Sequence, residues 1–97
     1  MTIYRFCLFL EGRQPMEVGR RDLPDIEQAQ DAAFDEAYDV ACEMVRFSYY
    51  READGLEVRI TDDAGRPQGL VRYHRACFTL HGLGGRRVPE ESVQQGA

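Results

Sequence analysis

The sequence LPDIEQAQDAAFDEAYDVACEMVRF, residues 23–47, decides the fold. Pro24 disfavours helical backbone at Leu23, and Asp25 can accept hydrogen bonds from the first free N–H groups of a helix. If Pro24 is instead the first helical residue, the cap is Leu23 or Asp22. Beyond Asp25, apolar residues recur at steps of three and four: Ile26, Ala29, Ala33, Ala37, Val40, Ala41, Met44 and Val45. This spacing predicts one amphipathic helix that reaches Phe47 or Tyr50 and turns its small residues inward.

The residues before the helix alternate as a strand does. In residues 3–10, IYRFCLFL, the side chains of Tyr4, Phe6, Leu8 and Leu10 share one apolar face, which we expect to pack against the helix. Glycine and proline in residues 12–15 indicate a turn. Residues 16–20 alternate more weakly, and we expect them to pair back as the second strand of a hairpin.

The residues after the helix predict a second hairpin. Residues 56–61 alternate between apolar and polar side chains, and the following DDAG, residues 62–65, is typical of a hairpin turn. Residues 69–80 are expected as the last strand, although the alternation becomes ambiguous beyond Tyr73. The order β-β-α-β-β predicts an α+β fold, a two-layer sandwich in which one mainly antiparallel four-stranded sheet packs on one long helix.

We assign residues 1–81 to this single domain. Residues 82–97 contain glycines, one proline and several polar residues, and they have too little apolar content to fold alone. We therefore expect residues 82–97 to form a flexible C-terminal tail.

Composition excludes several classes of protein. The 97 residues contain 17 acidic and 12 basic residues, which argues against a non-specific nucleic-acid binder. The sequence lacks the run of roughly 18 apolar residues that a membrane-spanning helix needs, and it lacks the features of a signal peptide, so we expect a cytoplasmic protein. Its three cysteines are widely spaced, which does not indicate a disulfide framework.

The predicted helix concentrates negative charge. Residues 25–46 hold seven acids and one arginine, a net charge of −6, whereas the rest of the chain holds 10 acids and 11 arginines. Five of the acids recur at every fourth residue and form a predicted acidic ridge: Glu27, Asp31, Asp35, Asp39 and Glu43. Three interpretations remain open: a solvated face, a docking surface for a basic partner, and a divalent-cation site, which usually recruits ligands from further elements.

A sheet covered by one helix leaves its second face open. We expect arginines and aromatic side chains there, and we name five residues as the candidate interaction face: Arg5, Phe9, Arg59, Arg72 and His74. This face could be solvated and salt-bridged through Glu57, could pair with a second copy or another protein, or could bind single-stranded nucleic acid by stacking and phosphate contacts. The acidic net charge counts against nucleic acid.

Residues able to support catalysis or metal binding form no recognisable motif. His74, Cys77 and His81 have the spacing H-x2-C-x3-H, but a structural zinc site needs four ligands, usually in two paired knuckles. Residues 82–87, GLGGRR, resemble a phosphate loop in glycine content alone. We therefore predict no catalytic residue, no cofactor and no metal, and we expect a non-catalytic domain that acts through protein contact or homodimerisation. Single-stranded nucleic-acid binding is the alternative.

Two blocks of sequence resemble a known family. The first joins YRF at residues 4–6 to LPDIEQA at residues 23–29, and the second is EVRITDDAGR at residues 57–66. Over residues 3–73 the chain is similar to an uncharacterised bacterial, alphaproteobacterial family of short proteins with an L-P-D-x-E-x-A helix start and a V-R-D-x-x-G-R hairpin. After Arg66 the sequence departs from that pattern. The resemblance implies no activity, cofactor or catalytic residue.

Overall fold

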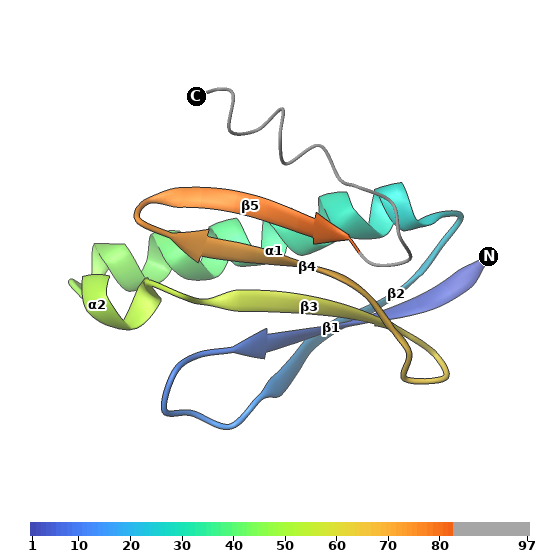
Figure 1. Ribbon diagram of the computed structural model, residues 1–97, viewed down its shortest axis with the longest axis horizontal. Helices are drawn as coiled ribbons and strands as arrows, with labels where there is room; N and C mark the ends of the chain where they lie inside the picture. Colours follow the sequence, from blue (N-terminus) through green and yellow to red (C-terminus); the bar gives the residue numbers. More distant parts are fainter. Residues whose placement is uncertain (83–97) are drawn as a thin grey trace.

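The computed structural model describes residues 1–82 of the chain, which form five strands and two helices. The elements are β1 (Thr2–Phe9), β2 (Met16–Leu23), α1 (Ile26–Arg46), α2 (Tyr50–Ala53), β3 (Glu57–Asp62), β4 (Pro67–His74) and β5 (Cys77–Gly82). Neighbouring strands pair antiparallel in the order β2-β1-β3-β4-β5. Helix α1 lies across one face of the sheet (Figure 1), which confirms the predicted α+β two-layer sandwich.

The sheet has five strands rather than the predicted four, because residues 69–80 fold back on themselves. Strand β4 ends at His74 and β5 begins at Cys77, and the residues between them, Arg75 and Ala76, have φ angles of 54° and 63°. Tight two-residue turns between antiparallel strands need such left-handed backbone and usually place asparagine, aspartate or glycine there. Arg75 and Ala76 do not belong to that set, so their side chains do not indicate a turn. The prediction of one long last strand is therefore wrong.

Helix α1 begins and ends close to the predicted bounds. The carboxylate of Asp25 accepts a hydrogen bond of 2.9 Å from the backbone N–H of Gln28, which confirms Asp25 as the N-cap. The last helical residue is Arg46, and Phe47 caps the C-terminus. The short helix α2, which the sequence pattern did not predict, follows at once and buries Ala53.

The core lies between α1 and the sheet and is built from small residues on one side and large ones on the other. Ala29, Ala33 and Ala37 of α1 are fully buried. Facing them are the largest buried side chains of the sheet layer, which are those of Phe6, Leu56, Val58, Ile60 and Val71. Alanine lets the helix axis approach the sheet closely, so the strands supply most of the buried apolar volume. The predicted inward side of α1 is therefore confirmed.

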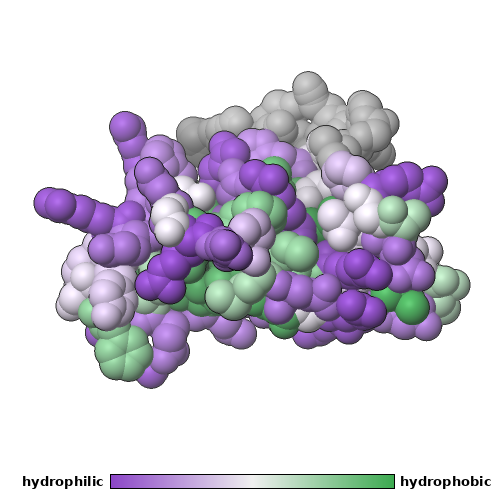
Figure 2. All heavy atoms as spheres, turned by 90° about the horizontal axis from the view of Figure 1, so that it is seen from below, coloured by the Kyte–Doolittle hydropathy of each residue, from purple (hydrophilic) through white to green (hydrophobic). Residues whose placement is uncertain are grey.

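Within residues 1–82, the second face of the sheet carries no covering layer (Figure 1). Gly82 closes β5, and the rest of the predicted tail, residues 83–97, lies outside the described residues. Seen from below the view of Figure 1, apolar side chains reach the surface in small patches between polar ones (Figure 2). Neither helix of the described part combines the length and apolar content needed to cross a membrane.

Candidate functional site

The open face of the sheet is organised by two rows of paired residues. In the first row, Cys7 of β1 pairs with Arg59 of β3, Arg59 pairs with Leu70 of β4, and Leu70 pairs with His81 of β5. The second row runs through the neighbouring pairs of the same strands: Phe9, Glu57, Arg72 and Thr79. Because side chains alternate along a strand, both rows lie on the face that points away from α1.

Glu57 is the centre of an ion-pair network on this face. Its Oε1 accepts a hydrogen bond from Nε of Arg59 at 2.8 Å, and its Oε2 accepts one from Nε of Arg72 at 2.9 Å. Burial of the Glu57 carboxylate would raise its pKa, but the hydrogen bonds from Arg72 and Arg59 outweigh burial and hold the pKa below its ordinary value. Two arginines on one carboxylate leave this cluster with a net charge of +1, held in a defined geometry.

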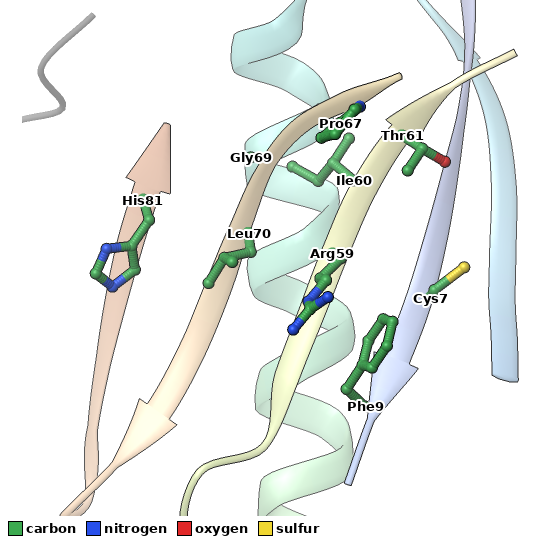
Figure 3. A pocket seen from close by; sticks show the side chains of 9 residues that line it. All are labelled: Cys7, Phe9, Arg59, Ile60, Thr61, Pro67, Gly69, Leu70 and His81. Atoms are coloured by element: carbon green, nitrogen blue, oxygen red, sulfur yellow. The ribbon is translucent and has the colours of Figure 1, made fainter. Parts of the chain in front are cut away.

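Arg59 also stacks on an aromatic ring. Its guanidinium carbon lies 4.0 Å from the centroid of the Phe9 ring, and Figure 3 shows the Arg59 side chain between Phe9 and Leu70. A hollow of about 310 Å³ lies beside Arg59, over β3 and β4. Its exposed surface is almost entirely carbon, and the residues that line it are Cys7, Phe9, Arg59, Ile60, Thr61, Pro67, Gly69, Leu70 and His81.

The structure brings together three residues of the candidate interaction face and separates the other two. Phe9, Arg59 and Arg72 surround Glu57. His74 stands at the end of β4, where its Nδ1 lies 3.2 Å from Oδ1 of Asp54.

Arg5 lies toward the opposite end of the face, beside the β3–β4 turn. Its Nη2 is 3.5 Å from Oδ1 of Asp63, and its buried Nε has no hydrogen-bond partner among the described residues. The candidate interaction face therefore consists of a compact central cluster, formed by Phe9, Arg59 and Arg72. Arg5 lies beyond one end of this cluster and His74 beyond the other.

Leu70 and His81 line the hollow, and the sequence analysis did not place them in the candidate site. Both positions depend on the register of β3, β4 and β5. The position of Leu70 could have been predicted from the sequence, because Leu70 lies two residues before Arg72 and therefore shares its face of a regular strand. His81 could be placed only once the turn at residues 75–76 was known.

The predicted acidic ridge winds around α1 rather than following one side of it. All five of its residues are exposed. At 3.6 residues per turn, each step of four residues advances about 40° beyond a full turn, so Glu27 and Glu43 lie about 160° apart around the axis.

Two contacts orient α1 relative to the sheet. The Phe34 ring packs on Phe78 of β5 with centroids 5.0 Å apart, and the Glu36 carboxylate lies over Gly19 of β2. By the same helical geometry, Glu27 and Asp31 lie on the β5 side of the helix. Asp39 and Glu43 lie on the β2 side, and Asp35 lies near the crest, so the two ends of the ridge face opposite edges of the sheet.

Groups that could hold a metal ion do not converge in the described part of the chain. Among residues 1–82, no three histidine, cysteine or acidic side chains lie close enough together to bind one. His74 and Cys77 flank the β4–β5 turn, and His81 lies further along β5, where its Nε2 is 3.0 Å from Oγ1 of Thr79.

Comparison with known protein families identifies a match. The family model described as Domain of unknown function (DUF6894) matches residues 3–74, which span β1 to the end of β4. The matched region closely follows residues 3–73, over which the sequence resembled an uncharacterised family. Neither the curated proteins nor the solved structures include a significant match to this chain.

Proposed function

The chain belongs to the DUF6894 family, a domain of unknown function, and we propose that it is a non-catalytic domain that binds a second copy of itself through the open face of its sheet. The observation that carries this proposal is the apolar hollow of about 310 Å³ beside the Glu57 cluster. When a partner side chain fills an apolar hollow at the surface of a small domain, water is displaced from apolar groups, and this favours association.

Charge on the open face also favours a protein partner. Glu57 fixes Arg59 and Arg72, so these cations are already compensated in part and need no phosphate to balance them. The same compensation argues against the alternative, single-stranded nucleic acid, because phosphate binding would have to compete with Glu57 for both side chains.

The size of the face suggests a reversible dimer. Five strands about 4.8 Å apart and roughly 20–25 Å long give a flat area of about 500 Å². Stable complexes bury about 800 Å² per partner, which is more than this flat area. The additional buried surface must come from side chains that project from the sheet and from the walls of the hollow. We therefore expect association in the micromolar range rather than an obligate dimer.

Light scattering after size-exclusion chromatography, run from micromolar to millimolar protein, tests the proposal. We expect the apparent mass to rise from 11.1 kDa toward twice that value. Leu70→Asp places a charge in the hollow and should return the protein to the monomer. Met16→Asp makes the same charge change at an exposed methionine outside the hollow and should leave association unchanged.

Three results would count against the proposal. One is a monomer at millimolar concentration, and another is equal loss of association in Leu70→Asp and Met16→Asp. The third is steeply salt-dependent binding of a single-stranded oligonucleotide that Leu70→Asp leaves intact, which would favour the nucleic-acid alternative. Circular dichroism of each variant checks that the fold is retained.

A further inference from the structure

The two edges of the sheet differ in how well they are protected. Edge strand β2 carries Glu17, Arg20, Arg21 and Asp22, and its pairing with β1 contains an irregularity between Phe6 and Cys7. Charged residues and bulges of this kind are the usual devices that keep an edge strand from pairing with another chain. Edge strand β5, with the sequence CFTLHG, has no acidic residue, arginine or proline and pairs with β4 in unbroken register.

The β4–β5 turn determines which backbone groups of β5 point outward. In a two-residue hairpin, the residues that flank the turn form a hydrogen-bonded pair, and every second residue along the strand repeats this orientation. Cys77 and Thr79 therefore direct their backbone groups toward β4. The N–H and C=O groups of Phe78 and Leu80 point away from the sheet, where another strand could pair with them.

An aromatic shelf lies beside this edge on the helix side. The Phe78 ring packs against the rings of Phe34 at 5.0 Å, Tyr38 at 5.8 Å and Tyr73 at 4.9 Å between centroids. Phe34 and Tyr38 remain 42% and 52% exposed, although both contact a partly buried ring. A strand added to β5 would place an apolar side chain on this shelf.

Negative charge flanks the other half of the edge. Strand β5 runs in the direction of the N-terminus of α1 (Figure 1), so along the helix axis its last residues are level with the first turns of the helix. Glu27 and Asp31 stand there on the β5 side of α1 and are exposed. An added strand would therefore meet apolar rings near Phe78 and carboxylates near Gly82.

We propose that the β5 edge accepts an extended, basic segment of a partner protein as a sixth strand, antiparallel to β5. On its helix-facing side the segment has basic residues in its N-terminal half, opposite Glu27 and Asp31, and apolar residues in its C-terminal half, opposite the aromatic shelf. Main-chain hydrogen bonds to Phe78 and Leu80 hold it, and the side chains decide its identity. This surface is separate from the open-face hollow, so it does not depend on dimerisation.

The proposal can be tested with a synthetic peptide, acetyl-Arg-Thr-Arg-Thr-Val-Thr-Val-amide, added to the full-length protein. We expect the backbone amide resonances of Phe78 and Leu80 to shift in NMR spectra and their hydrogen exchange to slow. The matched peptide with glutamate in place of arginine should bind much more weakly. A peptide with proline in place of the first valine, whose N–H would otherwise be donated to β5, should not bind.

Charge reversal at two different pairs of ridge residues tests whether the peptide recognises carboxylates beside β5 or responds only to the net charge of the protein. The double variant Glu27→Arg and Asp31→Arg should weaken binding of the arginine peptide roughly fivefold, as expected for two exposed ion pairs, and should strengthen binding of the glutamate peptide. The double variant Asp39→Arg and Glu43→Arg changes the net charge equally on the β2 side of the helix. It should leave both affinities nearly unchanged.

Three outcomes would overturn the proposal. Equal weakening by the two double variants would mean that only net charge matters. Amides of Phe78 and Leu80 that are already protected before peptide is added would mean that a second copy or the chain itself occupies the edge. Shifts confined to the open face, around Leu70, would place the peptide in the hollow instead.

Discussion

The two ends of β3 each hold a buried carboxylate bound by arginine, but the partners come from different distances along the chain. Asp62 accepts hydrogen bonds from the backbone N–H groups of Ala64 at 3.0 Å and Arg66 at 2.9 Å, and from Nε of Arg66 at 2.9 Å. At the other end, Glu57 is bound by Arg72, 15 residues away. The Asp62 network can form as soon as its turn forms, whereas the Glu57 network requires the register of β3 with β4.

This difference separates a structural element from a surface that can bind. Asp62 is the last residue of β3, and its carboxylate accepts most of its hydrogen bonds from the β3–β4 turn that follows, with one longer bond from Gln68 of β4. Glu57 lies on the open face and holds two arginines that remain partly exposed, with side chains 48% and 43% accessible. The local network stabilises the hairpin, and the long-range network shapes the candidate interaction face.

Asp62→Ala should cost more stability than a change at Glu57, the other buried carboxylate of β3. The substitution leaves two turn N–H groups and the Arg66 side chain without their acceptor. Thermal unfolding followed by circular dichroism measures the effect. Asp63→Ala, in the same turn but with a largely exposed side chain, is the control and should change the melting temperature little. Similar melting temperatures for both variants would contradict the role given to Asp62.

Glu57→Ala should lower the free energy of unfolding by about 1–2 kcal/mol. The estimate lies below that for a fully buried pair, because both arginines are partly solvated. Urea titration measures it, and Glu57→Gln, which retains an acceptor oxygen, should lose less. The alanine variant should also release Arg59 from its position and so change self-association, which Asp62→Ala should not. No change in either quantity would remove Glu57 from the proposed site.

Acid should weaken both ends of β3. Hydrogen bonds, first from the Arg66 backbone N–H and then from its side chain, lower the pKa of Asp62, and the two arginines lower that of Glu57. A carboxylate with a lowered pKa in the folded protein stabilises the fold above its unfolded pKa, here about 3.8 for Asp62 and about 4.5 for Glu57. That stability is lost as the pH falls through the folded pKa.

Urea titrations at a series of pH values below about 5 measure this loss. The double variant Asp62→Asn and Glu57→Gln should be less stable at neutral pH and should depend less on pH in the acid range. A double variant with the same acid slope as the native protein would show that other carboxylates control the acid response.

Ala76→Gly should give the smallest effect and the only gain, up to about 1 kcal/mol. Ala76 has a φ of 63°, which glycine adopts without the steric cost that a Cβ brings. Ala64→Gly, in the β3–β4 turn at a residue without positive φ, is the matched control and should lose stability. Chemical unfolding compares the two. A loss in Ala76→Gly would mean that the β4–β5 turn is not strained at this position.

Local signals predicted a large part of the fold. The alanine positions of the helix were predicted to face inward, and Tyr4, Phe6 and Leu8 were placed in the core; the structure confirms both predictions. The cap of α1 was predicted to within a few residues, and the structure selects Asp25 among the candidates. The split of the last strand was missed because Arg75 and Ala76 adopt a turn conformation that their side chains do not favour. The winding of the acidic ridge followed from helical geometry and could have been derived from the spacing.

The candidate site was harder to predict than the fold. The outward orientation of Phe9, Arg59 and Arg72 followed from alternation, but their convergence on Glu57 did not. Which residues meet across strands depends on strand order and register, and a shift of one residue would turn every side chain to the other face. Leu70 and His81 entered the site through that register alone.

By itself the sequence determined where α1 begins, which of its sides is buried, which side chains of β1 and β3 face the core, and where the β3–β4 turn lies. These features depend on interactions between residues close in the chain, whose energies follow from side-chain type and spacing. Tertiary structure alone decided that the described sheet has five strands, that Glu57 holds two arginines, and that residues 1–82 leave a hollow and the β5 edge uncovered. Those features require contacts between strands, which exist only after the chain has folded and the register is established.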